Sequence, residues 1–158
     1  MTMVAEDIMV TKLVTLSPHV DVLDAVRLLL KNRISGAPVV DADGKYLGVF
    51  SEKCAMQVIL DAAYDSLPTN HVGAFMDTQA RTIRPDTDLL SIAQVFLLTN
   101  FRRLAVVDEG GTLLGQISRR DVMAAGLKVI DDSYVEKTTE SSLLYLSAIH
   151  ERNSAPLA

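Results

Sequence analysis

The sequence predicts an α/β fold, α+β in the broader sense, in which two copies of one β-α-β-β-α unit pack as a pseudo-twofold pair. Shifting the chain by 67 residues aligns residues 7–60 with residues 74–127 without a gap. Within each copy, β-type stretches alternate with longer apolar stretches of helical character. Repeated units of this kind bury their apolar surface by packing on one another, so one compact body is expected.

The aligned copies carry identical residues along their whole length. The tripeptide Val-Val-Asp at 39–41 recurs at 106–108, and Pro18 aligns with Pro85. Other identical pairs are Met9/Met76, Thr11/Thr78, Thr15/Thr82, Asp21/Asp88, Leu30/Leu97, Gly48/Gly115, Ser51/Ser118 and Met56/Met123. A chance match would not stay in register over this length, so we expect the two copies to fold alike.

Each copy is expected to begin with a strand and then a helix. Residues 12–16 and 80–83 read as short strands that lead into a proline-containing turn. Helices are predicted over residues 22–30 and 89–98, because an aspartate stands in the N-cap position before each of them. The two N-cap residues are Asp21 and Asp88. Both helices are apolar on more than one face, so each is expected to be buried on two sides.

A hairpin and a closing helix complete each copy. The hairpin is predicted because two apolar strands flank a turn rich in Asp and Gly, and the second strand leads to Ser51 or Ser118. Apolar and mixed runs then predict a helix. The first strand, the turn and the closing helix are predicted over 37–40, 41–44 and 54–63 in the first copy, and over 104–107, 108–111 and 122–130 in the second.

Three segments are predicted from the extent of the repeat. The first motif with its N-terminal segment covers residues 1–67, the second motif covers 68–130, and a tail covers 131–158. The tail is expected to contain a helix over 141–152, where Leu and Ile recur at helical spacing. This helix either packs on a dimer or carries a signal to a partner protein; the sequence leaves both interpretations open.

Composition and charge narrow the possible functions. The net charge of −5 disfavours binding to a phosphate backbone, so no nucleic-acid partner is expected. Cys54 is the single cysteine and cannot form an intramolecular disulfide. Neither a signal peptide nor an apolar run of roughly 18 residues is found, so no membrane role is expected and a cytoplasmic location is predicted.

The repeated motifs resemble the cystathionine-β-synthase (CBS) domain, and residues 6–127 therefore resemble a tandem CBS pair. The residues that carry the resemblance are Asp7-Ile8-Met9, Pro18, Ala37-Pro38-Val39-Val40-Asp41, Gly44 and Gly48, and then Phe75-Met76, Pro85, Leu104-Ala105-Val106-Val107-Asp108, Gly111 and Gly115. The resemblance implies a stand-alone regulatory module and not an enzyme. It also implies that a cleft between the copies binds AMP, ADP, ATP or S-adenosylmethionine, that no other cofactor is required, and that a homodimer controls an unidentified protein.

The second copy carries the family's complete ligand motif. The family has Gly, then Ser or Thr, then Asp at three-residue intervals, and here these are Gly115, Ser118 and Asp121. A carboxylate accepts hydrogen bonds from ribose hydroxyls, while a hydroxyl and free amides at a helix start suit a phosphate. The resemblance thus assigns ribose to Asp121 and phosphate to Ser118. The alternative is that Ser118 and Asp121 only cap the last helix.

The resemblance also assigns the two ends of the nucleotide. Basic residues near the second hairpin are expected at the phosphates, since guanidinium groups bind phosphate oxygens bidentately; these are Arg102, Arg103, Arg119 and Arg120. The adenine end is expected from the first copy, at Thr11, Leu13, Ile34, Ser35 and Ala37. The alternatives are a solvated basic edge for the arginines and ordinary core positions for the first-copy residues.

The first copy departs from the ligand motif at three positions. Cys54 stands where Asp121 stands in the second copy, Gly36 replaces Arg103, and Glu52 replaces Arg119. This sister pocket is therefore expected to bind a weak or uncharged ligand, or none, because it lacks the ribose acceptor and carries an acid at the phosphate end.

Other chemistries have little support in the sequence. The three histidines lack a second ligand at metal-like spacing, and no nucleophile–base arrangement is found, so neither a metal site nor a catalytic residue is predicted. Cys54 is expected to be a packed small residue. A function of a different class, a ligand-independent dimeric scaffold for other proteins, remains an alternative.

Overall fold

The computed structural model describes residues 2–64 and 70–154. The chain divides into two compact units, Met1–Val122 and Met123–Ala158. The first unit contains both copies of the repeat and mixes helices with small sheets, which confirms the predicted fold class. The second unit is helical.

The helices and strands of the two copies keep the 67-residue offset of the sequence repeat. The first copy contains α1 (Ala5–Ile8), α2 (Val22–Asn32), β1 (Gly36–Val40), β2 (Tyr46–Ser51) and α3 (Glu52–Tyr64). The second copy contains α4 (Val72–Phe75), β3 (Thr82–Ile83), α5 (Leu89–Leu98), β4 (Arg103–Val107), β5 (Leu113–Ser118) and the start of α6 (Arg119–Ser154). The strands β1 and β2 begin 67 residues before β4 and β5, so the copies fold alike over their hairpins.

The opening of each copy differs from the prediction. A one-turn helix, α1 or α4, begins each copy, and residues 12–16 do not form a strand. Only Leu16 bridges to Val39, in parallel orientation, whereas β3 has two residues that pair with β4. The predicted strand over 12–16 is wrong because its side chains are mostly exposed, and only Leu16, at 3% exposure, reaches the core.

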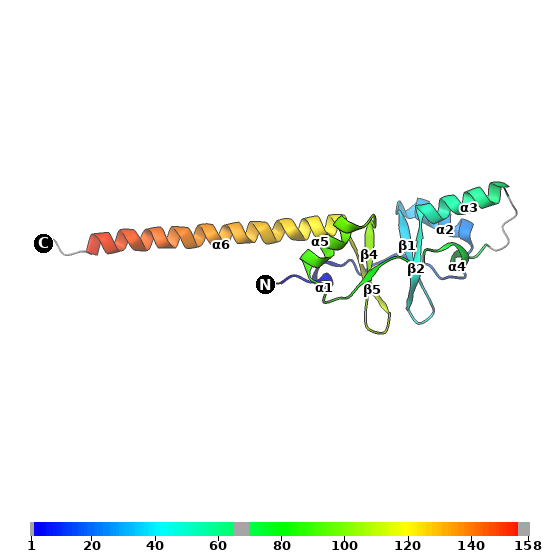
Figure 1. Cartoon of the computed structure of the whole chain (residues 1–158), viewed down its shortest axis with the longest axis horizontal. Coiled ribbons are helices and arrows are strands. Elements are labelled where there is room, and N and C mark those ends of the chain that lie inside the picture. Colours follow the sequence, from blue (N-terminus) through cyan, green and yellow to red (C-terminus); the bar gives the residue numbers. More distant parts are fainter. Residues whose placement is uncertain (1, 65–69, 155–158) are drawn as a thin grey trace. The chain divides into compact units, whose positions relative to one another are not determined.

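Two antiparallel hairpins, β1–β2 and β4–β5, form the centre of the first unit (Figure 1). The strand β3 adds to β4 in parallel, so the second sheet has three strands. Each hairpin packs one face on its own apolar core. Phe50 and Val58 belong to the first core, and Leu104 and Ile117 belong to the second.

The opening segments of the two copies are exchanged. Ala5, from α1, is fully buried in the second core, and Val72, from α4, is fully buried in the first. The Ala5 amide donates to the Thr87 carbonyl at 2.8 Å, and the Val22 amide donates to Asn70 at 2.6 Å. Each copy therefore completes the core of the other, and the two form a single folding unit.

The hairpin turns of the two copies also bond to each other. The Tyr46 amide donates to the Gly111 carbonyl at 2.9 Å, and the Leu113 amide donates to the Gly44 carbonyl at 3.1 Å. Gly44 and Gly111 have φ values of +80° and +83°, which side chains other than glycine rarely adopt. These turns fix the two sheets side by side, and both lie on the same side of the molecule in Figure 1.

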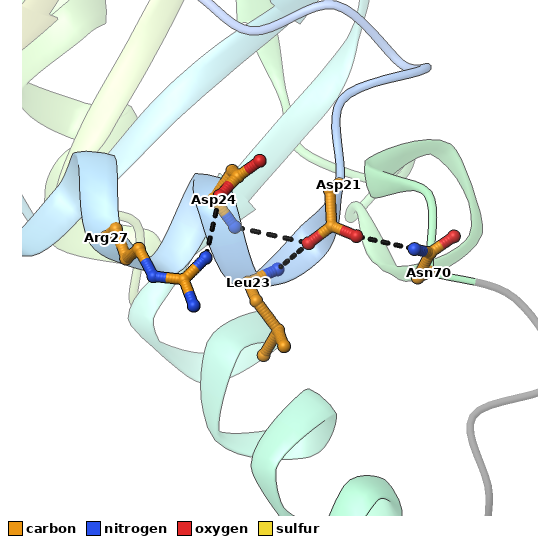
Figure 2. Close-up of polar contacts among 5 residues, drawn as sticks. All are labelled: Asp21, Leu23, Asp24, Arg27 and Asn70. Atoms are coloured by element: carbon orange, nitrogen blue, oxygen red, sulfur yellow. Dashed lines mark hydrogen bonds and ion pairs between the residues drawn. The ribbon is translucent and has the colours of Figure 1, made fainter.

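The predicted N-caps of α2 and α5 are confirmed. Asp21 accepts the Leu23 amide at 2.9 Å and the Asp24 amide at 3.3 Å, and its second oxygen accepts the Asn70 side chain (Figure 2). Asp88 accepts the Ser91 hydroxyl and amide, and these hydrogen bonds lower the pKa of the Asp88 carboxyl. The bond to Asn70 also ties the first long helix to the exchanged segment that leads into α4.

The helix α6 continues through the predicted end of the closing helix. A helix over 122–130 and a separate one over 141–152 were expected, but both ranges lie in the single helix Arg119–Ser154. Neither glycine nor proline occurs between Leu127 and Ser154, so nothing breaks the helix. Hydroxyls on four of its residues bond to carbonyls four positions earlier; these are Ser133, Thr138, Thr139 and Ser142. The predicted boundary between 67 and 68 lies outside the described residues.

Candidate functional site

Two cavities lie between the copies, within the first unit. The small cavity has a volume of about 230 Å³ and the large cavity of about 600 Å³. The small cavity is lined by Val10, Lys12, Leu13, Val14, Ile34, Gly36, Arg103, Gln116, Ser118 and Asp121. Residues that line the large cavity include Ser35, Gly36, Tyr46, Val49, Ser51, Glu52, Lys53, Asp77, Ala80, Arg81, Phe101, Arg102, Arg103 and Gln116.

The cavities are related by the sequence repeat. Adding 67 to a residue number in one cavity gives a lining residue of the other, as with Val10 and Asp77, Leu13 and Ala80, Val14 and Arg81, Ile34 and Phe101, Gly36 and Arg103, and Ser51 and Ser118. Equivalent residues of the two cavities differ in size and charge, however. Alanine for leucine leaves more room in the large cavity, and arginine for valine adds charge there.

Ser118 and Asp121 lie together at the start of α6. The Ser118 amide and hydroxyl both donate to Asp121 Oδ2 at 2.7 Å, and the Asp121 amide donates to the Ser118 hydroxyl at 3.3 Å. This reciprocal arrangement is a helix cap, as the alternative interpretation expected. Among the described residues Oδ1 accepts no hydrogen bond, and Asp121 lines the small cavity, so capping leaves one carboxylate oxygen for a ligand.

The equivalent pair in the first copy, Ser51 and Cys54, makes longer contacts than Ser118 and Asp121 do. The Ser51 hydroxyl lies 3.4 Å from the Cys54 sulfur, and the thiol donates to the Val49 carbonyl at 3.8 Å. Cys54 packs against the first core and does not line the large cavity. A thiol is a weak acceptor, so this position lacks the carboxylate that Asp121 supplies.

Arg103 is the predicted arginine that reaches the small cavity. It begins β4, where it pairs with Ser118 across the hairpin, and it lines both cavities. Arg102 lines the large cavity alone. Arg119 and Arg120 are exposed at the start of α6 and line neither cavity, because Asp121 is the side chain of this turn that faces back to Ser118. The expected group of four arginines in one cleft is therefore split.

The residues predicted for the adenine end are split in the same way. Leu13 and Ile34 line the small cavity with Asp121, whereas Ser35 lines the large cavity. Thr11 is exposed and lines neither cavity. Ala37 is fully buried in the first core, since alternation along β1 turns its side chain away from the cavities.

Lys12 and Gln116 were missed by the sequence analysis. Lys12 precedes Leu13 and brings a second cation to the small cavity. Gln116 is only 8% exposed, but it alternates along β5 with Ile117 of the second core and so faces the cavities instead. The two-residue period of a strand over 113–118 would have placed Gln116 on the same face as Ser118, opposite Ile117. The Val10–Gln116 bridge, which places residues 10–14 beside the second copy, leaves no local sequence signal.

The large cavity carries more charge than the sequence analysis predicted for it. Glu52 is present as expected and Asp77 joins it, but four cationic side chains line the same cavity; these are Lys53, Arg81, Arg102 and Arg103. Three of the four come from the second copy, so a comparison of motif positions within the first copy did not include them. The ion pairs within 4.0 Å among the described residues join Arg27 to Asp24 and Arg84 to Glu109, so these cavity cations have no such partner.

Tyr46 also lines the large cavity. Burial, with a contribution from the Asp77 carboxylate, raises the pKa of Tyr46 to about 12. The phenol therefore stays protonated at neutral pH and is a hydrogen-bond donor beside the cationic groups. Within residues 2–64 and 70–150, no group of three or more His, Cys, Asp and Glu side chains is placed to hold a metal ion. No helix in the described ranges is both long and apolar enough to cross a bilayer.

Two comparisons of sequence support a single family. Residues 4–61 and 72–128 each match the CBS domain family. An uncharacterised protein of Methanocaldococcus jannaschii is 30% identical over 153 residues, which cover 78% of this chain and 90% of that protein.

Solved structures agree with these matches. The Arabidopsis thaliana CBS-pair protein CBSX2, solved in complex with AMP, is 30% identical, with a TM-score of 0.69 over 80% of this chain and 97% of that chain. The cytosolic domain of the Mg²⁺ channel MgtE, solved in complex with ATP, is 26% identical, with a TM-score of 0.64. It matches 77% of this chain but only 48% of its own length, so the likeness concerns the paired domains and not the channel.

Proposed function

Because this chain belongs to the CBS domain family, with one domain in each copy of the repeat, we propose that it is a regulatory module that binds an adenine nucleotide in the small cavity. The observation that carries the proposal is the free Oδ1 of Asp121 in a cavity that Arg103 also lines. In this arrangement Asp121 accepts the ribose hydroxyls, and Arg103 binds the phosphate.

The remaining lining residues fit the other parts of such a ligand. Leu13 and Ile34 provide an apolar surface for a purine, and Lys12 adds a second cation for the phosphate. The volume of about 230 Å³ is below the ~300–1,000 Å³ of ordinary ligand pockets. A nucleoside monophosphate, partly open to solvent, suits this volume better than a triphosphate, so AMP is the favoured member of the class.

The relatives support the ligand class. CBSX2 was solved with AMP and the MgtE domain with ATP, and both exceed 25% identity to this chain. Neither fixes the ligand of this chain, since the residues that surround the small cavity are its own.

The module is further proposed to act as a homodimer that controls an unidentified protein. The helices α3 and α5 expose large apolar side chains, although α5 was expected to be buried on two sides. The most exposed on α5 are Leu90, Leu97 and Leu98, at 74%, 84% and 85%, and α3 exposes Met56, Ile59, Leu60 and Tyr64. Contact with a second copy would bury them. Sedimentation equilibrium is expected to show dimers, and a monomer at all concentrations would contradict this.

Isothermal titration calorimetry against AMP, ADP, ATP and S-adenosylmethionine tests the nucleotide site. Wild-type protein is expected to bind AMP, and Asp121→Ala to bind it at least tenfold more weakly, because hydrogen bonds to charged groups contribute about 1.5–3 kcal/mol. Asp121→Asn separates binding from capping, since the amide oxygen still accepts the Ser118 amide but carries no charge. Asp131→Ala, an exposed change on α6, is the matched control.

Two results would overturn the nucleotide site. Binding of AMP to Asp121→Ala as tight as its binding to wild-type protein would place the ligand elsewhere. A melting temperature unchanged by every nucleotide would favour the ligand-independent scaffold, because any ligand specific to the folded state stabilises it.

A further inference from the structure

Three residues line both cavities, and one of them is charged. Gly36, Arg103 and Gln116 are shared, and Arg103 alone carries a formal charge. We infer that an anion bound in one cavity weakens the binding of an anion in the other, because both draw on the Arg103 guanidinium. This inference rests on the proposed function, since it takes a nucleoside monophosphate as the occupant of the small cavity.

Arg103 is shared by the two cavities because the first copy has a glycine at the equivalent position. Gly36 begins β1 as Arg103 begins β4, and each pairs with a serine across its hairpin, Ser51 or Ser118. Two arginines at these positions would give each cavity a cation of its own. The first copy supplies a glycine, so one guanidinium stands between two cavities.

The cavities depend on Arg103 to different degrees. Without it, the small cavity retains Lys12 as a cation, against the carboxylate of Asp121. The large cavity retains three cations, Lys53, Arg81 and Arg102, against Glu52 and Asp77. The loss of Arg103 therefore affects phosphate binding more in the small cavity.

The charge and size of the large cavity indicate the class of its occupant. Its volume of about 600 Å³ lies within the range of ordinary ligand pockets. Its cations are free of ion pairs among the described residues, so they are available to phosphate oxygens. A ligand with several linked phosphates matches these groups, and inorganic tripolyphosphate is a probe that carries only this part of the chemistry.

Two physical effects give the coupling its sign. An edge of the guanidinium that forms a bidentate pair with a phosphate in one cavity is not available to a phosphate in the other, so an anion in one cavity weakens this contact in the other. Two anions on either side of one side chain also repel each other. Coupling between binding sites is reciprocal, so the effect has the same size in both directions.

Calorimetric titration of AMP with and without saturating tripolyphosphate tests the inference. Wild-type protein is expected to bind AMP at least fivefold more weakly when tripolyphosphate is present, within the usual range of such couplings. Arg103→Gln is expected to bind AMP more weakly from the start and to show a much smaller further loss with tripolyphosphate, because only the repulsion between the two anions remains. Arg27→Gln, which removes an arginine that lines neither cavity, is expected to keep the wild-type coupling.

A second variant separates coupling from direct competition in the small cavity. The double change Arg81→Gln and Arg102→Gln alters only the large cavity and is expected to abolish the effect of tripolyphosphate on the Kd for AMP. An effect that persists in this variant would show direct competition and overturn the inference. So would an AMP affinity that tripolyphosphate leaves unchanged in the wild type. Failure of wild-type protein to bind AMP at all would instead overturn the proposed function, and the inference with it.

Discussion

The two copies of the repeat share their backbone and differ in the groups that they bring to the cavities. The hairpins β1–β2 and β4–β5 have the same pairing pattern, with an irregularity at the same place, after Val39 and after Val106. Cys54, Gly36 and Tyr46 in the first copy correspond to Asp121, Arg103 and Leu113 in the second. The two copies therefore share the positions that fix the hairpins, and the differences at the three positions named above concern the surface between the copies.

The largest expected effect concerns two equivalent glycines. A Cβ added at Gly48 would lie 2.5 Å from the Asp77 carbonyl oxygen, whereas at Gly115 it would lie 2.7 Å from the Met9 sulfur and 2.9 Å from the Val10 carbonyl oxygen. Gly48→Ala is expected to cost about 3 kcal/mol. Gly115→Ala is expected to cost about 2 kcal/mol, because its shortest contact is with the side chain of Met9 and its backbone contact is longer than that at Gly48. Urea denaturation measures both.

Gly126→Ala is the matched control for these substitutions. An added Cβ there meets nothing within 4 Å, and alanine favours a helix, so a gain of about 0.5–1 kcal/mol is expected. Equal losses of unfolding free energy at Gly48 and Gly115 would mean that the two hairpins pack equally tightly against the exchanged segments.

The second prediction restores the missing carboxylate of the first copy. Cys54→Asp places an acceptor three residues after Ser51, as Asp121 follows Ser118. We expect adenosine to bind the large cavity at least tenfold more tightly, as hydrogen bonds to a charged group contribute about 1.5–3 kcal/mol. Calorimetry measures the change, with Cys54→Ser as an uncharged control. No gain over Cys54→Ser would show that the carboxylate is not what distinguishes the cavities.

A smaller effect is expected at the link between α2 and the exchanged segment. Asp21→Ala removes the cap of α2 and the bond to Asn70, and a loss of about 1 kcal/mol in unfolding free energy is expected. Asp24→Ala, which breaks only an exposed ion pair with Arg27, should cost no more than ~0.5 kcal/mol. Equal losses of unfolding free energy for the two variants in chemical denaturation would mean that the cap and the Asn70 bond of Asp21 contribute no more than an exposed ion pair.

The smallest effect depends on pH. The pKa of Tyr46 is raised from 10.0 to about 12 in the folded protein, so the folded state retains a proton that the unfolded chain loses above pH 10. Stability linked to Tyr46 is thus fully present below pH 10 and falls as the pH rises to about 12. Tyr46→Phe should lose less stability across this window, by about 1 kcal/mol after screening by solvent. In alkaline denaturation, an equal fall of unfolding free energy with pH in wild-type protein and Tyr46→Phe would contradict the raised pKa of Tyr46.

Features set by neighbouring residues were predictable from the sequence. The hairpins, both N-caps and the Ser118–Asp121 pair depend on contacts within a few positions, and the structure contains them. The exchange of α1 and α4 depends on contacts between distant segments, and so the motif alone assigned Arg102 and Ser35 to the wrong cavity. The strand expected over 12–16 is absent for another reason, since only Leu16 of this stretch reaches the core.

Two further errors have simple physical causes. The closing helix was expected to end at Ile130, soon after the repeat stops, although neither glycine nor proline follows to break it before Ser154. Lys12 was missed because its significance depends on Val10, which bridges to Gln116 of the other copy. Lys12 thus lines the cavity because its segment folds against the second copy, and no motif in the sequence marks this contact.

The exchanged segments also determine the order in which the chain can fold. The Ala5 amide bonds to the Thr87 carbonyl, and the Leu89 amide bonds to the Met3 carbonyl, so residues 3–5 reach their partners only after the whole of the first copy has been synthesised. The first copy likewise lacks Val72 until the second copy has begun to emerge. Contacts of such large separation in sequence slow folding. A chain cut between the copies would leave both halves with open cores, so the two copies are expected to fold together in a single cooperative step.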